Sequence, residues 1–188
     1  NGYPDGTFKP AQAVTRGQAA KMLVNAYGLT KGDKTVSFTD VSASNEYAEA
    51  IQVLASQGFI NGYADGTFKP TEEITRGQFA KILTNILGLT SNSSNPFTDV
   101  ATSSEYYSAI IALFENGITK GTSAGTYSPA VDVTRGQLSS FIVRGLTWLE
   151  ENAPEGPQEP TPEGAFNLSI LHVNDTHANV QQFPKLVT

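Results

Sequence analysis

Asn61-Gly62-Tyr63-Ala64-Asp65-Gly66-Thr67-Phe68-Lys69-Pro70 nearly repeats residues 1–10, which read Asn-Gly-Tyr-Pro-Asp-Gly-Thr-Phe-Lys-Pro. A looser copy occupies residues 120–129. Each copy leads into the same tetrad, Thr-Arg-Gly-Gln, which begins at Thr15, Thr75 and Thr134. Recurrence of one motif at a spacing of about 60 residues indicates an array of a single supersecondary unit.

Each unit is predicted to fold as a leading helix, a long loop and a second helix that starts at the tetrad. Apolar residues recur there at helical spacing, and a Gly follows each helix where a left-handed residue would end it. In the second copy, the two stripes are Tyr47, Ile51 and Leu54, then Phe79, Ile82, Leu83 and Ile86. The third copy repeats this pattern, whereas the first lacks its leading helix. The fold class is therefore expected to be all-α, with five helices.

Composition narrows the range of functions. The chain of 188 residues has a net charge of −6 and no cysteine, so disulfides and thiolate metal sites are excluded. Lys and Arg nearly balance Asp and Glu up to residue 150, and most of the acidity follows it. No basic face favours nucleic acid, and no apolar run approaches the roughly 18 residues of a membrane span.

Changes in composition set the expected domain boundaries. The repeats are assigned to residues 1–30 (partial), 31–90 and 91–149. Residues 150–164 are rich in Pro and Glu, which predicts an extended linker. Residues 165–188 open with an apolar strand and are interpreted as the truncated start of a second domain, so we take the chain to be an excerpt of a longer polypeptide.

The tetrad combines a helix cap with a misplaced charge. Its Thr and Gln form a capping box. Its Arg (Arg16, Arg76 or Arg135) is then the first helical residue, where a cation opposes the helix dipole. Such a cation beside free helix amides favours an anion site for phosphate or carboxylate. The Gly that follows, Gly17 or Gly77, would let a ligand approach the backbone. The alternative is that each Arg pairs internally, for example with Asp40 or Asp99, as part of a scaffold.

The loop motif has a mixed interpretation. Asp5 and Asp65 precede Gly and are most simply turn residues, although with Tyr3 and Tyr63 they could contact a sugar. The aromatic residue near the end of each loop is expected to plug the core: Phe8, Phe68 and Tyr127. One Asp per loop is too few oxygen ligands for a calcium loop.

Taken together, the Phe-Thr-Asp-Val segments, the Gly-Tyr-x-Asp-Gly-Thr-Phe loops and the Thr-Arg tetrads resemble the surface-layer homology (SLH) repeat over residues 1–149. The resemblance implies a three-pronged, pseudo-threefold helical bundle on the outside of a bacterium, in the cell wall or surface layer. It also implies binding of a peptidoglycan-linked secondary cell-wall polysaccharide, often pyruvylated, without a cofactor.

Carried over position by position, the family's binding residues fall on Arg16, Arg76, Arg135, Asp5, Asp65, Tyr47 and Tyr106. The third loop departs from the family pattern, with Thr122 and Ala124 in place of Tyr and Asp, which puts the third groove in doubt. We expect Arg16 and Arg76 to clamp the anion, with help from helix amides. Arg76→Ala should then weaken polymer binding more than it lowers stability.

The tail resembles a second family. The segment 168–177, Leu-Ser-Ile-Leu-His-Val-Asn-Asp-Thr-His, is similar to the opening strand of 5′-nucleotidase-type metallophosphoesterases. This implies that Asp175 and His177 would ligate a divalent metal pair (Zn, Mn or Fe) in a domain whose other ligands are absent here. The parent polypeptide would then be a phosphoesterase anchored by the repeats. A helical scaffold for protein–protein contacts in a surface lattice is the remaining alternative, and the oligomeric state is not indicated.

Overall fold

Five helices build the part of the chain that the computed structural model describes, residues 2–3, 5–91 and 93–153. They are α1 (Arg16–Tyr27), α2 (Ala48–Ser56), α3 (Arg76–Leu87), α4 (Tyr107–Glu115) and α5 (Arg135–Glu151). These residues contain isolated β-bridges and no extended strand. The expected all-α class with five helices is confirmed. None of the helices among these residues combines the length and apolarity needed to cross a bilayer.

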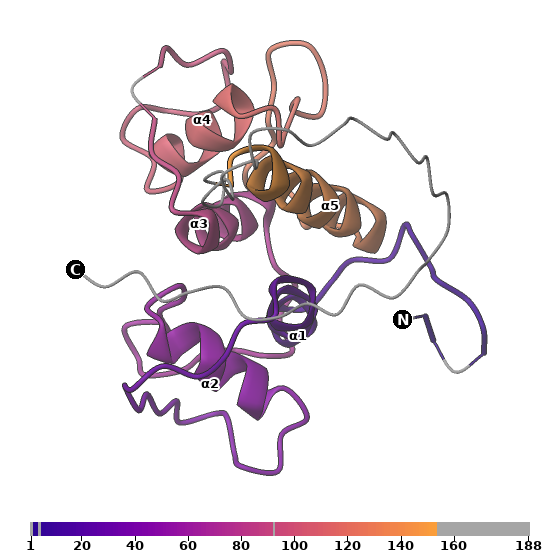
Figure 1. Ribbon diagram of the computed structural model, residues 1–188, viewed down its shortest axis with the longest axis vertical. Helices are drawn as coiled ribbons and strands as arrows, with labels where there is room; N and C mark the ends of the chain where they lie inside the picture. The colour runs from indigo at the N-terminus through magenta and orange to yellow at the C-terminus, as the bar shows by residue number, and fades with distance from the viewer. Residues whose placement is uncertain (1, 4, 92, 154–188) are drawn as a thin grey trace, which may run out of the picture. The chain divides into compact units, whose positions relative to one another are not determined.

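The helices pair across repeats rather than within them. In Figure 1, α2 lies against α1 and α4 lies against α3. Each pair joins the second helix of one repeat to the leading helix of the next. The third such position belongs to α5, which packs on α1 and α3 and has no leading helix against it among the described residues.

One prediction about the core is wrong, and it concerns the loop of the first repeat. Phe68 and Tyr127 are 1% and 0% exposed, as predicted, whereas Phe8 is 42% exposed. Phe68 packs on Phe38 and Tyr127 packs on Phe97, at ring centroid distances of 5.4 and 5.5 Å. Both partners come from the segment that precedes a leading helix, and the described part of the first repeat has no such segment to cover Phe8.

A closed ring of backbone hydrogen bonds ties the three repeats together at their common centre. The Val14 amide donates to the Val133 carbonyl at 3.0 Å, and the Val133 amide donates to the Ile74 carbonyl at 2.9 Å. The Ile74 amide completes the ring by donating to the Val14 carbonyl at 3.0 Å. All three side chains are fully buried. Each repeat therefore depends on both others, unlike a linear solenoid whose units contact only their neighbours.

Local sequence fixes where the second helices start. Thr15, Thr75 and Thr134 are N-caps, and each forms the full capping box with the Gln three residues later. At the other end, α1 and α3 finish at Gly28 and Gly88, whose φ values of 59° and 64° suit a residue without Cβ. These starts and stops confirm the predicted ones.

The C-terminal boundary differs slightly from expectation. Helix α5 continues to Glu151, so the expected linker start at residue 150 falls inside the helix. The compact unit that holds all five helices runs from Asn1 to Ala153. The remainder of the predicted linker and the predicted strand, with Asp175 and His177, lie outside the described residues.

Candidate functional site

Each tetrad Arg is a staple between repeats. The Nε of Arg16 donates to the Phe68 carbonyl at 2.8 Å, so the first repeat grips the loop of the second. Arg76 makes the same bond to the Tyr127 carbonyl at 2.8 Å. Arg135 closes the cycle by donating to the Phe8 carbonyl at 2.9 Å, across 127 positions of sequence. Each tetrad Arg therefore donates a hydrogen bond to the loop of the next repeat, and not to the loop of its own repeat.

The helix amides that we expected to meet an anion are already satisfied. The amide of Arg16 donates to the Glu72 carbonyl at 2.8 Å, and the amide of Gly17 donates to the Pro70 carbonyl at 2.9 Å. The third amide, of Gln18, donates to the cap hydroxyl of Thr15. The other two tetrads repeat this arrangement. Since no donor remains at these helix starts, the predicted contribution of helix amides to binding is wrong.

The tetrad Gly makes room for an aromatic ring rather than for a ligand. A Cβ on Gly17 would lie 2.4 Å from the Tyr47 ring, and one on Gly77 would lie 2.6 Å from the Tyr106 ring. Both tyrosines are N-caps of leading helices. The predicted approach of a ligand to the backbone at Gly17 and Gly77 is therefore blocked, while the same Gly positions bring Tyr47 and Tyr106 close to the tetrads.

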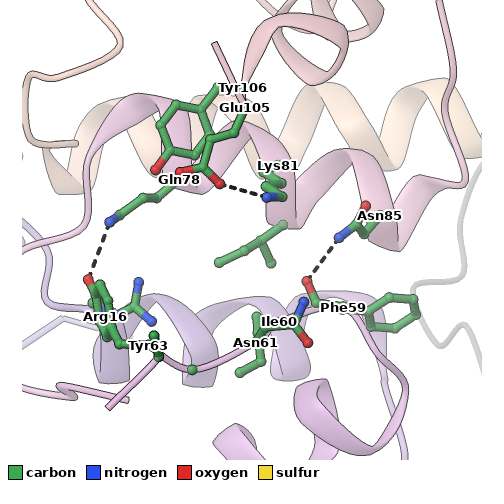
Figure 2. A pocket seen from close by; sticks show the side chains of 13 residues that line it. Arg16, Phe59, Ile60, Asn61, Tyr63, Gln78, Lys81, Asn85, Glu105 and Tyr106 are labelled. Carbon is green, nitrogen blue, oxygen red and sulfur yellow. Dashed lines mark hydrogen bonds and ion pairs between the residues drawn. The ribbon is translucent and has the colours of Figure 1, made fainter. Parts of the chain in front are cut away.

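One cavity of about 300 Å³ gathers functional side chains from all three repeats. We call it the Arg16 groove and define it by Arg16, Tyr63, Gln78, Lys81, Glu105 and Tyr106. Figure 2 shows the guanidinium of Arg16 and the side chain of Lys81 facing the same space. Gln78 donates to the Tyr63 hydroxyl at 3.4 Å, and Lys81 pairs with Glu105 at 2.8 Å. Lys81 is thereby held at the wall of the cavity that Arg16 also lines, and Arg16 is 7% exposed.

The Arg16 guanidinium contacts two aromatic rings and one carbonyl, while the carboxylates of Glu72 and Asp40 act on it electrostatically without forming an ion pair. Its guanidinium carbon lies 4.9 Å from the centroid of Tyr63 and 4.5 Å from that of Phe68, in cation–π contact. No carboxylate of the described residues is within ion-pair distance of it. Burial lowers the pKa of Arg16, but a guanidinium remains charged in proteins. The Nη groups are thus available to an anion.

The first repeat contributes to a second set of side chains at the positions equivalent to those of the Arg16 groove. We call it the Arg135 groove and define it by Arg135, Tyr3, Gln18, Lys21, Glu46 and Tyr47. Arg135 lies 4.8 Å from the Tyr3 ring centroid, and Lys21 is 4.0 Å from Glu46. Burial first, and the neighbouring Glu second, raises the pKa of Tyr47 here and of Tyr106 in the Arg16 groove. The two sets therefore have the same residue types at equivalent positions, and the pKa of the tyrosine from the leading helix is raised in both.

The surroundings of Arg76 are different. We call this region the Arg76 site and define it by Arg76, Thr122, Tyr127 and Phe141. Arg76 is 3% exposed and sits 4.5 Å from the Tyr127 centroid and 5.5 Å from that of Phe141. Its Nη2 is buried without a hydrogen-bond partner among the described residues. Burial raises the pKa of Tyr127 to about 12, and its hydroxyl donates to the Arg76 carbonyl at 3.2 Å. Arg76 is the least exposed of the three tetrad Arg residues, since Arg16 and Arg135 are each 7% exposed.

Loop carboxylates hold the backbone in shape. Asp65 accepts the amide and the hydroxyl of Thr67, at 3.0 and 2.6 Å, and Asp5 does the same with Thr7. These bonds lower the pKa of both exposed carboxyls, and Asp65 does not line the Arg16 groove. Asp40 accepts the amides of Phe68 and Lys69, and Asp99 accepts the equivalent pair in the third loop. The alternative of ion pairs between Asp40 or Asp99 and the tetrad Arg is thus not what forms.

Several groove residues escaped the sequence interpretation. Lys81, Glu105 and Asn85 line the Arg16 groove. Around the preceding helix pair, α1 and α2, the equivalent positions carry Lys21, Glu46 and Asn25. These residues recur at equivalent positions in two copies, and Ser140 replaces the Lys in the third. This pattern could have identified them as candidate site residues. It was missed because these residues read as an ordinary solvated helix face.

Comparison with known proteins identifies the family of this chain. The S-layer homology domain matches residues 1–20, 37–80 and 96–139. The chain belongs to the S-layer homology family. It is 33% identical over 159 residues to "Cell surface glycoprotein 1" of Acetivibrio thermocellus, which covers 77% of this chain and 7% of that protein.

Two further relatives are named for the same location. "Surface-layer 125 kDa protein" of Lysinibacillus sphaericus is 39% identical, over 71% of this chain and 12% of its own length. "Cellulosome-anchoring protein" of A. thermocellus is 30% identical, over 95% of this chain and 38% of its own length. This chain thus spans from 7% to 38% of these three relatives. It is a bacterial cell-surface module of the class that anchors proteins to the cell wall.

Proposed function

We propose that the chain anchors its parent polypeptide by binding an anionic, pyruvate-ketal-bearing secondary cell-wall polysaccharide in the Arg16 and Arg135 grooves. The observation that carries this proposal is the Arg16 guanidinium. It is buried, lacks a carboxylate partner among the described residues and faces a cavity of about 300 Å³. A cation held in this way gains most from a ligand that brings its own carboxylate.

Each side chain of the groove has a proposed role. The planar fork of Arg16 suits the carboxylate of the ketal, which accepts two parallel N–H bonds. Tyr63 and Tyr106 provide faces on which a sugar ring stacks. Lys81 adds positive charge at the side of the groove, and Gln78 and Asn85 provide amide groups for sugar hydroxyls. In the Arg135 groove, Tyr3, Tyr47 and Lys21 take the corresponding roles. Asp5 and Asp65 accept sugar hydroxyls from outside the cavity.

A co-sedimentation assay tests this function. The intact chain is mixed with purified bacterial cell walls, with walls from which the secondary polysaccharide has been extracted, and with walls stripped of the ketal by mild acid. The expected result is binding to the first preparation alone. Equal binding to all three would point to peptidoglycan, and binding to none would favour the scaffold for protein–protein contacts.

We further propose that the anchored cargo is a metal-dependent phosphoesterase of the 5′-nucleotidase type. The support is the motif at Asp175 and His177, which lie outside the described residues. Relatives that bear enzyme names, such as "Endoglucanase" of a Bacillus species at 35% identity, support only the more general idea of an enzyme as cargo. Those two residues offer a carboxylate and an imidazole, which suit Zn, Mn or Fe. Chelator-sensitive release of phosphate from a nucleotide by the full-length parent is the expected result, and its absence would leave the anchor role intact.

A further inference from the structure

A second cavity of about 210 Å³ adjoins the Arg16 groove along α3 and α4. The two cavities share Lys81, Asn85 and Glu105, which are labelled in Figure 2. Beyond these three, the second cavity is lined by hydroxyl-bearing and small apolar side chains: Thr84, Thr90, Ser91, Ser108, Leu89 and Ala109. The first cavity alone reaches the lower end of the roughly 300–1,000 Å³ typical of small-molecule sites, so the pair offers room for more than one sugar residue.

The second cavity is rich in acceptors. Thr84 already donates its hydroxyl proton to the Ala80 carbonyl, and Ser91 donates to Glu115. The amide nitrogen of Asn85 donates to the Phe59 carbonyl, which leaves its oxygen as an acceptor. Glu105 accepts from Lys81 and also interacts with the Tyr106 hydroxyl, so its carboxylate is already engaged. Such a lining offers hydroxyl and amide oxygens to the hydroxyl groups of a neutral sugar, and its one carboxylate is already paired with Lys81.

We propose that the two cavities bind consecutive residues of one glycan chain, with the anionic residue in the Arg16 groove and a neutral sugar residue in the second cavity. This proposal rests on the glycan binding proposed above. The shared Lys81–Glu105 pair marks the boundary between the two parts, since both residues line both cavities. Leu89 and Ala109 provide a small apolar surface for the carbon face of that sugar.

The Arg135 groove lacks the equivalent lining. At the positions of Thr84, Ser91 and Ser108, the pair α1–α2 carries Val24, Lys31 and Glu49. Two hydroxyls are thus replaced by long charged side chains, and the third by an apolar one. The two grooves should therefore differ in the length of glycan that they bind. The Arg135 groove takes the anionic residue alone, and the Arg16 groove takes that residue together with its neighbour.

The experiment compares the two grooves within one molecule. The wall polysaccharide of the co-sedimentation assay is partly hydrolysed and separated into a ketal-bearing monosaccharide and longer ketal-bearing fragments. Side-chain amide NMR signals of Asn85 and Asn25 then report on the Arg16 and Arg135 grooves during titration. We expect the longer fragments to bind about tenfold more tightly than the monosaccharide at Asn85. At Asn25 the two should bind equally.

Ser108→Glu supplies the decisive variant, because it copies Glu49 of the other pair. A Glu in the first turn of α4 is compatible with the helix dipole, so the fold is retained. The variant should lose the tenfold gain at Asn85 and keep its affinity for the monosaccharide. Ser103→Glu, exposed and outside both cavities, is the charge-matched control and should change neither.

The outcomes separate the two proposals. Equal affinity of wild-type protein for monosaccharide and longer fragments at Asn85, or a gain that survives Ser108→Glu, overturns the second subsite and leaves glycan anchoring in place. Failure of every fragment to shift either signal overturns glycan anchoring itself.

Discussion

The Arg16 groove and the Arg76 site start from the same tetrad and end with different capacities. In both, the Arg Nε holds the next loop by a bond of 2.8 Å. At the Arg16 groove the neighbouring positions carry Tyr63, Ile82 and Lys81, with Tyr106 from a leading helix. At the Arg76 site the same positions carry Thr122, Phe141 and Ser140.

This difference separates two roles of one residue. The staple is common to all three tetrads, so it belongs to the fold. The cavity at Arg16 lies where the next loop brings Tyr63 and a leading helix brings Tyr106. At the Arg76 site the larger Phe141 lies against the guanidinium instead. We therefore propose that Arg16 and Arg135 bind the anion and that Arg76 is structural, in place of the prediction that Arg76 is one of the two main clamps.

The largest expected effect on stability is that of Arg76→Ala. This change removes a buried charged donor and leaves the Tyr127 carbonyl without its partner. Loss of such a hydrogen bond costs about 1.5–3 kcal/mol, which corresponds to a fall in Tm of roughly 3–12 °C for a domain of this size. Urea unfolding measures it. An unchanged unfolding midpoint would show that the staple contributes nothing.

The tetrad Gly residues give a second, smaller contrast. Gly77→Ala should push Tyr106 out of place, since the new Cβ would lie 2.6 Å from its ring. We expect a loss of about 1–3 kcal/mol, as for other overpacked sites. Gly136→Ala meets only Pro10, at 3.2 Å, and gains helix propensity, so it should cost clearly less. Equal unfolding free energies of the two variants would contradict the role assigned to Tyr106.

Lys81 tests how much the groove depends on a second cation. Lys81→Ala should lower the affinity for the ketal-bearing monosaccharide about threefold, because a partly exposed charge contributes up to about 1 kcal/mol. The loss should shrink at high salt. Lys34→Ala, exposed and outside both cavities, serves as the control. A salt-independent loss, or an equal loss in the control, would show that Lys81 does not act through its charge.

The smallest expected effect is on the free energy of unfolding at acidic pH. Desolvation raises the pKa of Asp99, but the amides of Tyr127 and Ser128 outweigh it and hold this pKa below its ordinary value of 3.8. A carboxyl whose pKa is lower when folded adds stability above pH 3.8 and loses it as pH falls through the folded pKa. Asp99→Asn should therefore unfold with a weaker pH dependence below about pH 4 than the wild type. Parallel curves for the two proteins would exclude this contribution.

Local chemistry made most of the fold predictable. The capping boxes at Thr15, Thr75 and Thr134 and the left-handed stops at Gly28 and Gly88 depend on residues within one turn of the helix end, which the sequence displays directly. Apolar stripes with a helical period likewise identified all five helices. The end of the third repeat was predicted at residue 149, slightly too early, because α5 continues to Glu151 beyond its apolar stripe.

For the site, the sequence identified several of the residues but not the contacts between them. Which loop each Arg meets is decided by contacts across 51, 52 and 127 positions, and the local pattern carries no information on them. For the same reason Gly17 and Gly77 looked open, although the rings that fill them come from the next repeat. Thr122 and Ala124 visibly depart from the loop pattern of the other repeats. The Arg that contacts their loop, however, is Arg76 and not Arg135 of their own repeat.

One titration tests the division of roles most directly. The ketal-bearing monosaccharide is added to the wild type, Arg16→Ala and Arg76→Ala at a temperature where the NMR spectra show all three folded. We predict that Arg16→Ala loses at least about tenfold in affinity at the Asn85 signal and little at Asn25. Arg76→Ala should keep both affinities within about twofold of the wild type. Loss of binding in Arg76→Ala, with Arg16→Ala unaffected, would contradict the account.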